Sequence, residues 1–281
     1  MDNTMRFYHD SKPNWLTNVL SRAQHWKILS NNHFAKWVDG CVLCGRTTAQ
    51  SRLSPRLCAF CTEQLPHHLS NNLSDTNEFH RCAQCAHLLS TPEPYCLECL
   101  TEPPAFTHTI AFADYAEQMQ HMLLQYKFHN ALHLAPVLAD ALRHALSHYA
   151  QQHRPDVIVL VPQLDERTAE RGFNHLRLLM QQISLRDIWR EAVPTYAPDA
   201  IIRLHHERLQ IHVKPDMRRK QVKNAFTVAD KKLFKNTHVL LIDDIITTGA
   251  TLNEIARVLK NAGARQVDNV VIARTRKTPL K

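Results

Sequence analysis

The chain has 281 residues, of which 44% are apolar and 21% are charged, a composition typical of a globular protein with one sizeable domain and a smaller module. No run of 18 apolar residues occurs, and residues 1–30 lack a continuous apolar core. The sequence therefore supports neither a membrane span nor a secretory signal, and we expect a cytoplasmic protein without membrane insertion. The net charge of +8 favours polyanionic partners, either nucleic acid or a pyrophosphate group, with a solvated basic face as the simpler alternative.

Changes in composition along the chain predict three parts. Residues 1–40 combine three tryptophans with apolar residues at helical spacing, which predicts a helical arm that either packs on the body or binds a partner. Residues 41–104 contain all the cysteines, and prolines at positions 103 and 104 mark the end of this module. Residues 105–281 alternate between strand and helix patterns and form the larger domain.

Eight cysteines form four CxxC pairs, an arrangement that chance would not produce. They are Cys41, Cys44, Cys58, Cys61, Cys82, Cys85, Cys96 and Cys99. The two thiolates of one pair can bind one Zn²⁺, and two pairs complete a tetrahedral site, so four pairs predict two zinc sites. Disulfides are a weaker alternative because no export signal is present, and a redox motif does not explain four copies.

The order in which the cysteine pairs combine is open, because they could pair in sequence or interleave. Loop-closure entropy mildly favours the shorter loops of sequential pairing, which we predict. A closed site of four thiolates leaves no coordination position for a substrate, so we expect both metal ions to be structural. A module of about sixty residues has little room for its own core, and metal binding would supply much of its stability.

Strand and helix patterns alternate along the larger domain. The predicted strands are residues 109–115, 156–161, 237–242 and 267–273. The predicted helices are residues 117–128, 132–150, 166–184 and 252–262. This alternation predicts an α/β fold with a doubly wound, mainly parallel sheet, and ligands of such sheets bind beyond the carboxyl ends of the strands.

The segment LLIDDIITTGAT at residues 240–251 has the most specific chemical pattern in the chain. An apolar strand leads to Asp243 and Asp244, and a hydroxyl-rich turn containing Gly249 leads into an amphipathic helix. The unpaired N–H groups and the dipole of a helix N-terminus can hold a phosphate. Neighbouring acids on an extended segment diverge, so they suit a diol better than a single metal ion. An ordinary strand-to-helix turn is the simpler alternative, and a Walker-type loop is excluded by the missing glycines.

Residues 239–251 resemble the phosphoribosyl-pyrophosphate (PRPP) loop of type I phosphoribosyltransferases. The resemblance implies that Asp243 and Asp244 bind the ribose 2′- and 3′-hydroxyls. It also implies that the turn cradles the 5′-phosphate with Thr247, Thr248, Gly249, Ala250 and Thr251. In that fold Mg²⁺ bridges pyrophosphate and ribose oxygens, so Mg²⁺ is the expected cofactor of PRPP binding.

Four further segments are similar to one branch of these transferases, at residues 126–129, 161–162, 171–174 and 221–226. With a cysteine module in front, residues 41–276 resemble the ComF family, phosphoribosyltransferase-like proteins associated with DNA uptake in natural competence. The resemblance implies additional PRPP contacts from Val161, Pro162, Arg171 and Lys127. A surface salt bridge is the simpler alternative for the arginine, and a solvated side chain for the lysine.

Two functions from different classes fit these features. In the one we favour, the protein binds PRPP or a related phosphoribosyl ligand and handles single-stranded DNA during uptake, through phosphate contacts and base stacking. The candidate DNA-binding residues are Arg218, Arg219, Lys220 and Lys223. The second function is transfer of ribose 5-phosphate from PRPP to an unidentified nucleobase-like acceptor, for which no catalytic residue is identified. The resemblance also implies other competence proteins, such as a DNA helicase, as partners.

Overall fold

The structure is a computed structural model, and it describes residues 40–46, 51, 53–65, 80–163, 172–204 and 222–276. All of these residues belong to one compact unit, Gly40–Lys281. The predicted helical arm at residues 1–40 lies outside the described residues except for Gly40. The division of the chain at residues 40 and 104 stays a prediction.

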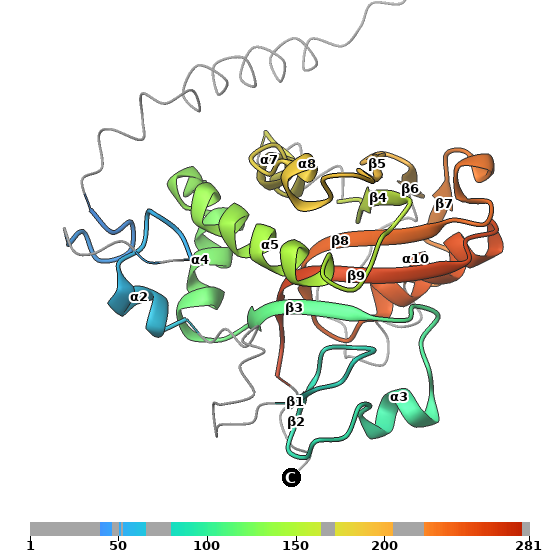
Figure 1. Cartoon of the computed structure of the whole chain (residues 1–281), viewed down its shortest axis with the longest axis horizontal. Helices are drawn as coiled ribbons and strands as arrows, with labels where there is room; N and C mark the ends of the chain where they lie inside the picture. Colours follow the sequence, from blue (N-terminus) through green and yellow to red (C-terminus); the bar gives the residue numbers. More distant parts are fainter. Residues whose placement is uncertain are drawn as a thin grey trace, which may run out of the picture. The chain divides into compact units, whose positions relative to one another are not determined.

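A five-stranded sheet forms the centre of the larger domain (Figure 1). Its order is β3-β9-β8-β4-β5, and every neighbouring pair is parallel. The strands are β3 (Thr109–Asp114), β4 (Val157–Leu160), β5 (Thr195–Tyr196), β8 (His238–Ile246) and β9 (Gln266–Arg274). The predicted α/β class with a parallel sheet is therefore confirmed.

Alternate residues of the central strands face two different helix layers, as the period of two in a strand requires. One face packs against α4 and α5, and its central side chains are Ile158, Leu160, Leu240, Ile242, Val270 and Ile272. The opposite face packs against α10 through Val157, Val159, Val239, Leu241, Val267 and Val271. Burial on both faces explains the continuous apolar runs at residues 157–161, 239–242 and 270–273, and it makes the sheet doubly wound.

Most helices begin and end close to the predicted positions. They are α4 (Glu117–Phe128), the 3-10 turn η2 (Leu132–Leu134), α5 (Ala135–Tyr149), α7 (His175–Met180), α8 (Leu185–Ile188), the 3-10 turn η3 (Lys231–Phe234) and α10 (Ala250–Asn261). The predicted helix at 166–184 is wrong within the described residues. Gly172 has a φ of 76°, and the Asn174 side chain caps a new, short helix by accepting a bond from the Arg177 N–H at 3.0 Å. Residues 164–171 lie outside the described part.

The edge strand β5 and the short strands outside the main sheet were not predicted. The strands β6 (Ile201–Arg203) and β7 (Phe226–Val228) pair antiparallel as a separate two-stranded sheet. The basic segment at residues 205–221 connects them and is outside the described residues. Strands of three residues are too short to show a reliable alternation in sequence.

The cysteine module consists of short elements that pack against the larger domain. They are α2 (Ala59–Glu63), β1 (His80–Arg81), β2 (Leu88–Leu89) and α3 (Leu97–Thr101). Cys41, Cys58 and Cys61 join the core that includes α4 and α5, whereas all four cysteines of the last two pairs join the core on the α10 side. Among the helices of the described part, none is long and apolar enough to cross a membrane.

Candidate functional site

The two adjacent acids lie near the carboxyl end of β8, inside the strand and not after it. Asp243 pairs with Val271 of β9 in the parallel ladder, and Asp243 and Asp244 are 9% and 4% exposed. Strand β8 is thus longer than the predicted 237–242, because the ladder with β9 continues past both acids to Ile246. The carboxylates therefore face a mostly dry environment, which strengthens every interaction they make.

The turn after β8 is open to solvent and leads directly into the twelve-residue helix α10. Thr247 and Thr248 are exposed, and the Oγ1 of Thr248 accepts a bond from the Ala250 N–H at 3.3 Å. Gly249 has a φ of 78°, a left-handed conformation that favours glycine. The first N–H groups of α10 have no partners inside the helix, so this turn can accept a phosphate group.

Asp244 is held by two cationic or hydrogen-bonding side chains from different elements. The Nζ of Lys127, in the last turn of α4, lies 2.6 Å from Asp244 Oδ2. The Nε2 of His175, the first residue of α7, contacts the same oxygen. The side chain of Lys127 is 15% exposed and that of His175 is 1% exposed, so this triad is nearly buried.

The pKa values of the neighbouring acids shift in opposite directions. Burial, followed by the charge of Asp244, raises the pKa of Asp243 well above its ordinary value. Burial alone would also raise the pKa of Asp244, but Lys127 and His175 outweigh it and hold that pKa below its ordinary value. One carboxyl group can thus donate a proton in a hydrogen bond while its neighbour accepts, a combination suited to vicinal hydroxyls.

The other predicted PRPP contacts occupy different positions around this edge of the sheet. Val161 is buried directly after β4, and its N–H donates to the Ile242 carbonyl at 3.0 Å, while Pro162 is half-buried beside it. Lys127 is brought to Asp244, so the solvated alternative for it is wrong. Arg171 lies outside the described residues.

His175 was missed by sequence reasoning, although it follows the predicted residues 171–174 directly. Its main chain is fixed by Tyr126, whose hydroxyl donates to the His175 carbonyl at 3.0 Å. Asn174 caps the helix that His175 begins, and so sets the direction in which the imidazole leaves the backbone. The position of His175 directly after residues 171–174 was a signal that could have identified it. Its contact with Asp244 of β8 depends on the fold and cannot be read from the sequence.

Arg274 was also missed, because its place near the basic tail favours a solvated side chain. It is 2% exposed at the end of β9. Its Nε donates to the Cys85 carbonyl at 3.0 Å, and its Nη1 donates to the carbonyls of Ile246, at 3.1 Å, and of Thr247. One buried guanidinium therefore connects the second half of the cysteine module to the turn after β8.

The eight cysteines gather into two groups of four. Cys41, Cys44, Cys58 and Cys61 form the first group, and Cys82, Cys85, Cys96 and Cys99 form the second. The predicted sequential pairing is confirmed. The Sγ atoms of Cys44 and Cys58 are 3.8 Å apart, and those of Cys85 and Cys96 are 3.6 Å apart. Four thiolates about 2.3 Å from one ion would be about 3.8 Å from each other, so both groups fit a tetrahedral metal ion.

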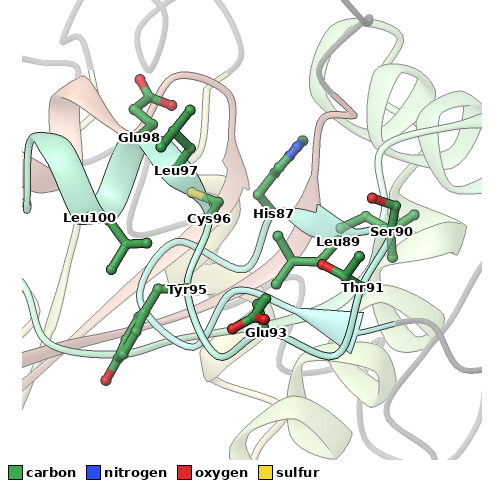
Figure 2. Close-up of a pocket in the computed structure, with 11 residues that line it drawn as sticks. His87, Leu89, Ser90, Thr91, Glu93, Tyr95, Cys96, Leu97, Glu98 and Leu100 are labelled. Atoms are coloured by element: carbon green, nitrogen blue, oxygen red, sulfur yellow. The ribbon is translucent and has the colours of Figure 1, made fainter.

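A surface hollow of about 480 Å³ lies beside the second cysteine group and not at the phosphate turn (Figure 2). Tyr95, Leu97 and Leu100 are 41%, 76% and 64% exposed at this hollow. Of the predicted DNA-binding residues, Lys223 is exposed just before β7. The other three, Arg218, Arg219 and Lys220, lie outside the described residues.

The parallel sheet and the acid-rich strand before an exposed threonine turn define a protein with the phosphoribosyltransferase fold. Accordingly, the family model of the phosphoribosyl transferase domain matches residues 197–281. The chain is 30% identical over 222 residues to "Competence protein F" of Haemophilus influenzae, covering 78% of this chain and 90% of that protein. The chain therefore belongs to the ComF family.

Other relatives span most of the same region. "DNA utilization protein YhgH" of Escherichia coli K12 is 30% identical over 197 residues, covering 69% of this chain and 84% of the relative. "Competence protein ComFC" of Streptococcus pneumoniae is 28% identical over 249 residues, covering 83% of this chain and 99% of the relative. The resemblance to the family on motifs alone is thus confirmed across both the cysteine module and the sheet domain.

Proposed function

We propose that this protein binds PRPP or a related phosphoribosyl ligand at the carboxyl end of β8 and handles single-stranded DNA during natural transformation. The observation that carries the ligand proposal is the exposed turn at Thr247 and Thr248, which joins two buried acids to the N-terminus of α10. The 5′-phosphate would lie at the turn, and the diol would reach Asp243 and Asp244.

The acids have distinct proposed roles toward the diol. Asp243, whose pKa is raised by burial and by its neighbour, would donate to one hydroxyl in its protonated form, and Asp244, whose pKa is lowered, would accept from the other. Lys127 and His175 hold Asp244 in place before the ligand arrives, which lowers the entropy lost on binding. Mg²⁺ bound with PRPP would neutralise its pyrophosphate oxygens.

The two cysteine groups are proposed to hold one structural Zn²⁺ each. Their Sγ separations fit a tetrahedral ion. In the second group, a hydrogen bond from Cys85 lowers the pKa of Cys82 to about 4, and that contact raises the pKa of Cys85, so the thiols oppose one another's ionisation. A divalent ion would relieve this conflict by stabilising all four thiolates.

The DNA proposal rests on charge, on exposed rings and on the names of the relatives. The segment between β6 and β7 contains Arg218, Arg219 and Lys220, and exposed Lys223 follows it. The aromatic rings of Phe60 and Tyr95, both in the cysteine module, are 61% and 41% exposed and offer surfaces on which bases can stack. Relatives named for competence and for DNA utilization support the same role.

Calorimetric titration with PRPP and Mg²⁺ tests the ligand site. We expect wild type to bind PRPP. The variant that combines Asp243→Asn with Asp244→Asn should bind at least about 100-fold more weakly, because both carboxyl groups that would hydrogen-bond the diol are replaced. Asp230→Asn, which changes an exposed acid away from the turn, is the matched control. Equal affinity in the double variant and the wild type would remove the proposed diol site.

Fluorescence anisotropy with a labelled oligonucleotide at several salt concentrations tests the DNA proposal. Replacing Arg218, Arg219, Lys220 and Lys223 with Ser should weaken binding and flatten the dependence of log affinity on log salt. A control with the same loss of charge replaces the exposed residues Arg190, Lys231, Lys232 and Lys235 with Ser. If both variants lose the same affinity, binding follows net charge and the proposed segment has no special role.

An active phosphoribosyltransferase is the alternative, favoured by the intact turn and acid pair. Pyrophosphate release from PRPP in the presence of single nucleobases would support it. The double Asp variant should then lose release, whereas the serine variant of the basic segment should retain it.

A further inference from the structure

A second cluster of ligating side chains lies at the opposite end of the sheet from the phosphate turn. His108 comes directly before β3, His153 lies between α5 and β4, and Asp268 is the third residue of β9. The amino ends of parallel strands meet at one edge, so three residues far apart in the sequence come together there. Their ligand atoms all lie within 4.8 Å of one another.

The separations fit a small metal ion. The Nδ1 of His108 is 3.4 Å from Oδ1 of Asp268. Two ligands bound tetrahedrally about 2.0–2.1 Å from Zn²⁺ would be about 3.3 Å apart. Nδ1 of His108 is itself buried and makes no hydrogen bond within the described part of the chain. This nitrogen faces the Asp268 carboxylate at ion-pair distance, in the position that a metal-bound imidazole nitrogen would take beside a carboxylate ligand.

Neighbouring groups fix the position and orientation of the Asp268 carboxylate. Asp268 is fully buried, and its Oδ2 accepts from the Tyr149 hydroxyl at 2.8 Å and lies 2.6 Å from His238 Nε2. Its Oδ1 accepts from the His108 backbone N–H at 3.2 Å. Such outer contacts hold ligating carboxylates in metal sites.

The second histidine is also held in place. The His153 ring stacks on Tyr149 with the ring centroids 4.6 Å apart, and its carbonyl accepts from the Trp189 indole N–H at 3.3 Å. Both histidines are only half-buried, so solvent reaches the cluster from their side.

We propose that His108, His153 and Asp268 form a third metal site, for a divalent transition-metal ion of the Zn²⁺ type. Two imidazoles and one carboxylate suit such an ion better than Mg²⁺ or Ca²⁺, which prefer oxygen ligands. The three ligands leave the remaining coordination position for water or a small anion. This site is independent of the PRPP turn and of the cysteine groups.

Cobalt titration of the full-length, untagged protein tests the site. The cysteine groups are first filled with Zn²⁺, which Co²⁺ does not displace readily because zinc binds more tightly. We expect one further equivalent of Co²⁺ to bind with visible ligand-field bands and without the near-ultraviolet bands of cobalt thiolates. His108→Gln and His153→Gln should each weaken that binding at least about 100-fold, since each removes a ligand.

His133→Gln, an exposed histidine in η2, is the matched control and should bind Co²⁺ as wild type does. Tyr149→Phe should weaken binding about 10-fold by freeing the carboxylate, while both histidines remain. In wild type, Co²⁺ should also shift two exchangeable imidazole N–H resonances, a readout that needs no variant. Absence of a cobalt equivalent free of thiolate bands, or equal affinity in all the variants, would overturn the proposal.

Discussion

Asp243 and Asp244 show how two identical neighbouring residues acquire different chemistry. Both are buried, but Asp244 contacts Lys127 and His175, whereas Asp243 contacts the Asp244 backbone N–H at 2.9 Å. Lys127 and His175 thus lower the pKa of Asp244, whereas burial and the charge of Asp244 raise that of Asp243. The difference follows from where the fold places Lys127 and His175, which reach Asp244 from α4 and α7.

Replacing Asp243 with Asn should stabilise the protein above about pH 4. The pKa of this acid is raised in the folded state from an ordinary value of 3.8, so the folded chain keeps a proton that the unfolded chain has lost. Stability of the wild type therefore falls as the pH rises from 3.8 through the folded pKa. Asn also accepts the Asp244 N–H but does not titrate. Thermal unfolding from pH 4 to pH 8 should show a gain that grows with pH, and a constant difference would contradict this expectation.

Replacing Lys127 with Met should destabilise the fold by about 3 kcal/mol, because it removes the ammonium group that pairs with a buried carboxylate. Adding Asp244→Asn should recover much of the loss, since the uncompensated charge is removed. Denaturant unfolding of the single and double variants measures the coupling. Lys232→Met, at an exposed position, should change stability by less than about 0.5 kcal/mol.

At the scale of elements, the turn between β8 and α10 depends on one backbone conformation. A Cβ at Gly249 would meet its nearest atom, Ile246 Cδ1, at 3.5 Å, which is an ordinary contact. A β-carbon therefore has enough space at position 249. The left-handed φ of 78° is what limits the residue types that fit there.

Gly249→Ala should therefore cost about 1–2 kcal/mol of stability, and it should weaken PRPP binding by shifting the turn's N–H groups. Gly249→Asn should cost less, because asparagine adopts this conformation more readily than alanine. Chemical denaturation and PRPP titration of both variants compare the two effects. A larger loss with Asn than with Ala would show that side-chain size, and not backbone conformation, limits the position.

At the scale of the whole molecule, the second cysteine group and the sheet domain form one continuous structure. Cys82, Cys85, Cys96 and Cys99 belong to the same core as the α10 face of the sheet. Arg274 joins the Cys85 carbonyl to the phosphate turn, and Arg81 joins the module to Asp114 of β3 through a 2.7 Å ion pair. These contacts therefore couple the position of the cysteine module to the turn at which ligand binding is proposed.

Removing the metal ions with a chelator should lower the melting temperature of the protein by about 10 °C or more, and adding Zn²⁺ should restore it. Cys85→Ser should destabilise the sheet domain more than Cys44→Ser, because Cys85 is buried in the shared core and Cys44 is exposed. Hydrogen exchange at residues 247–251 should increase with Cys85→Ser. Unchanged exchange there would mean that the module and the turn are not coupled.

The sequence alone determined the fold class, the membership of the cysteines in four pairs and the place of the acid and threonine turn. These features depend on local patterns: period-two and helical spacing, CxxC pairs, and residues adjacent in the chain. The ends of α4, at Glu117 and Phe128, were predicted from spacing for the same reason.

The tertiary structure decided which distant residues act together. His175 and Lys127 reach Asp244 from two helices, Arg274 is buried between the module and the turn, and His108 and His153 reach Asp268 at the far edge of the sheet. Each contact joins residues tens or more than a hundred positions apart, so it arises from the order of the parallel strands. Local spacing contains no information about that order, and the charge of a buried group depends on the neighbours that the fold supplies.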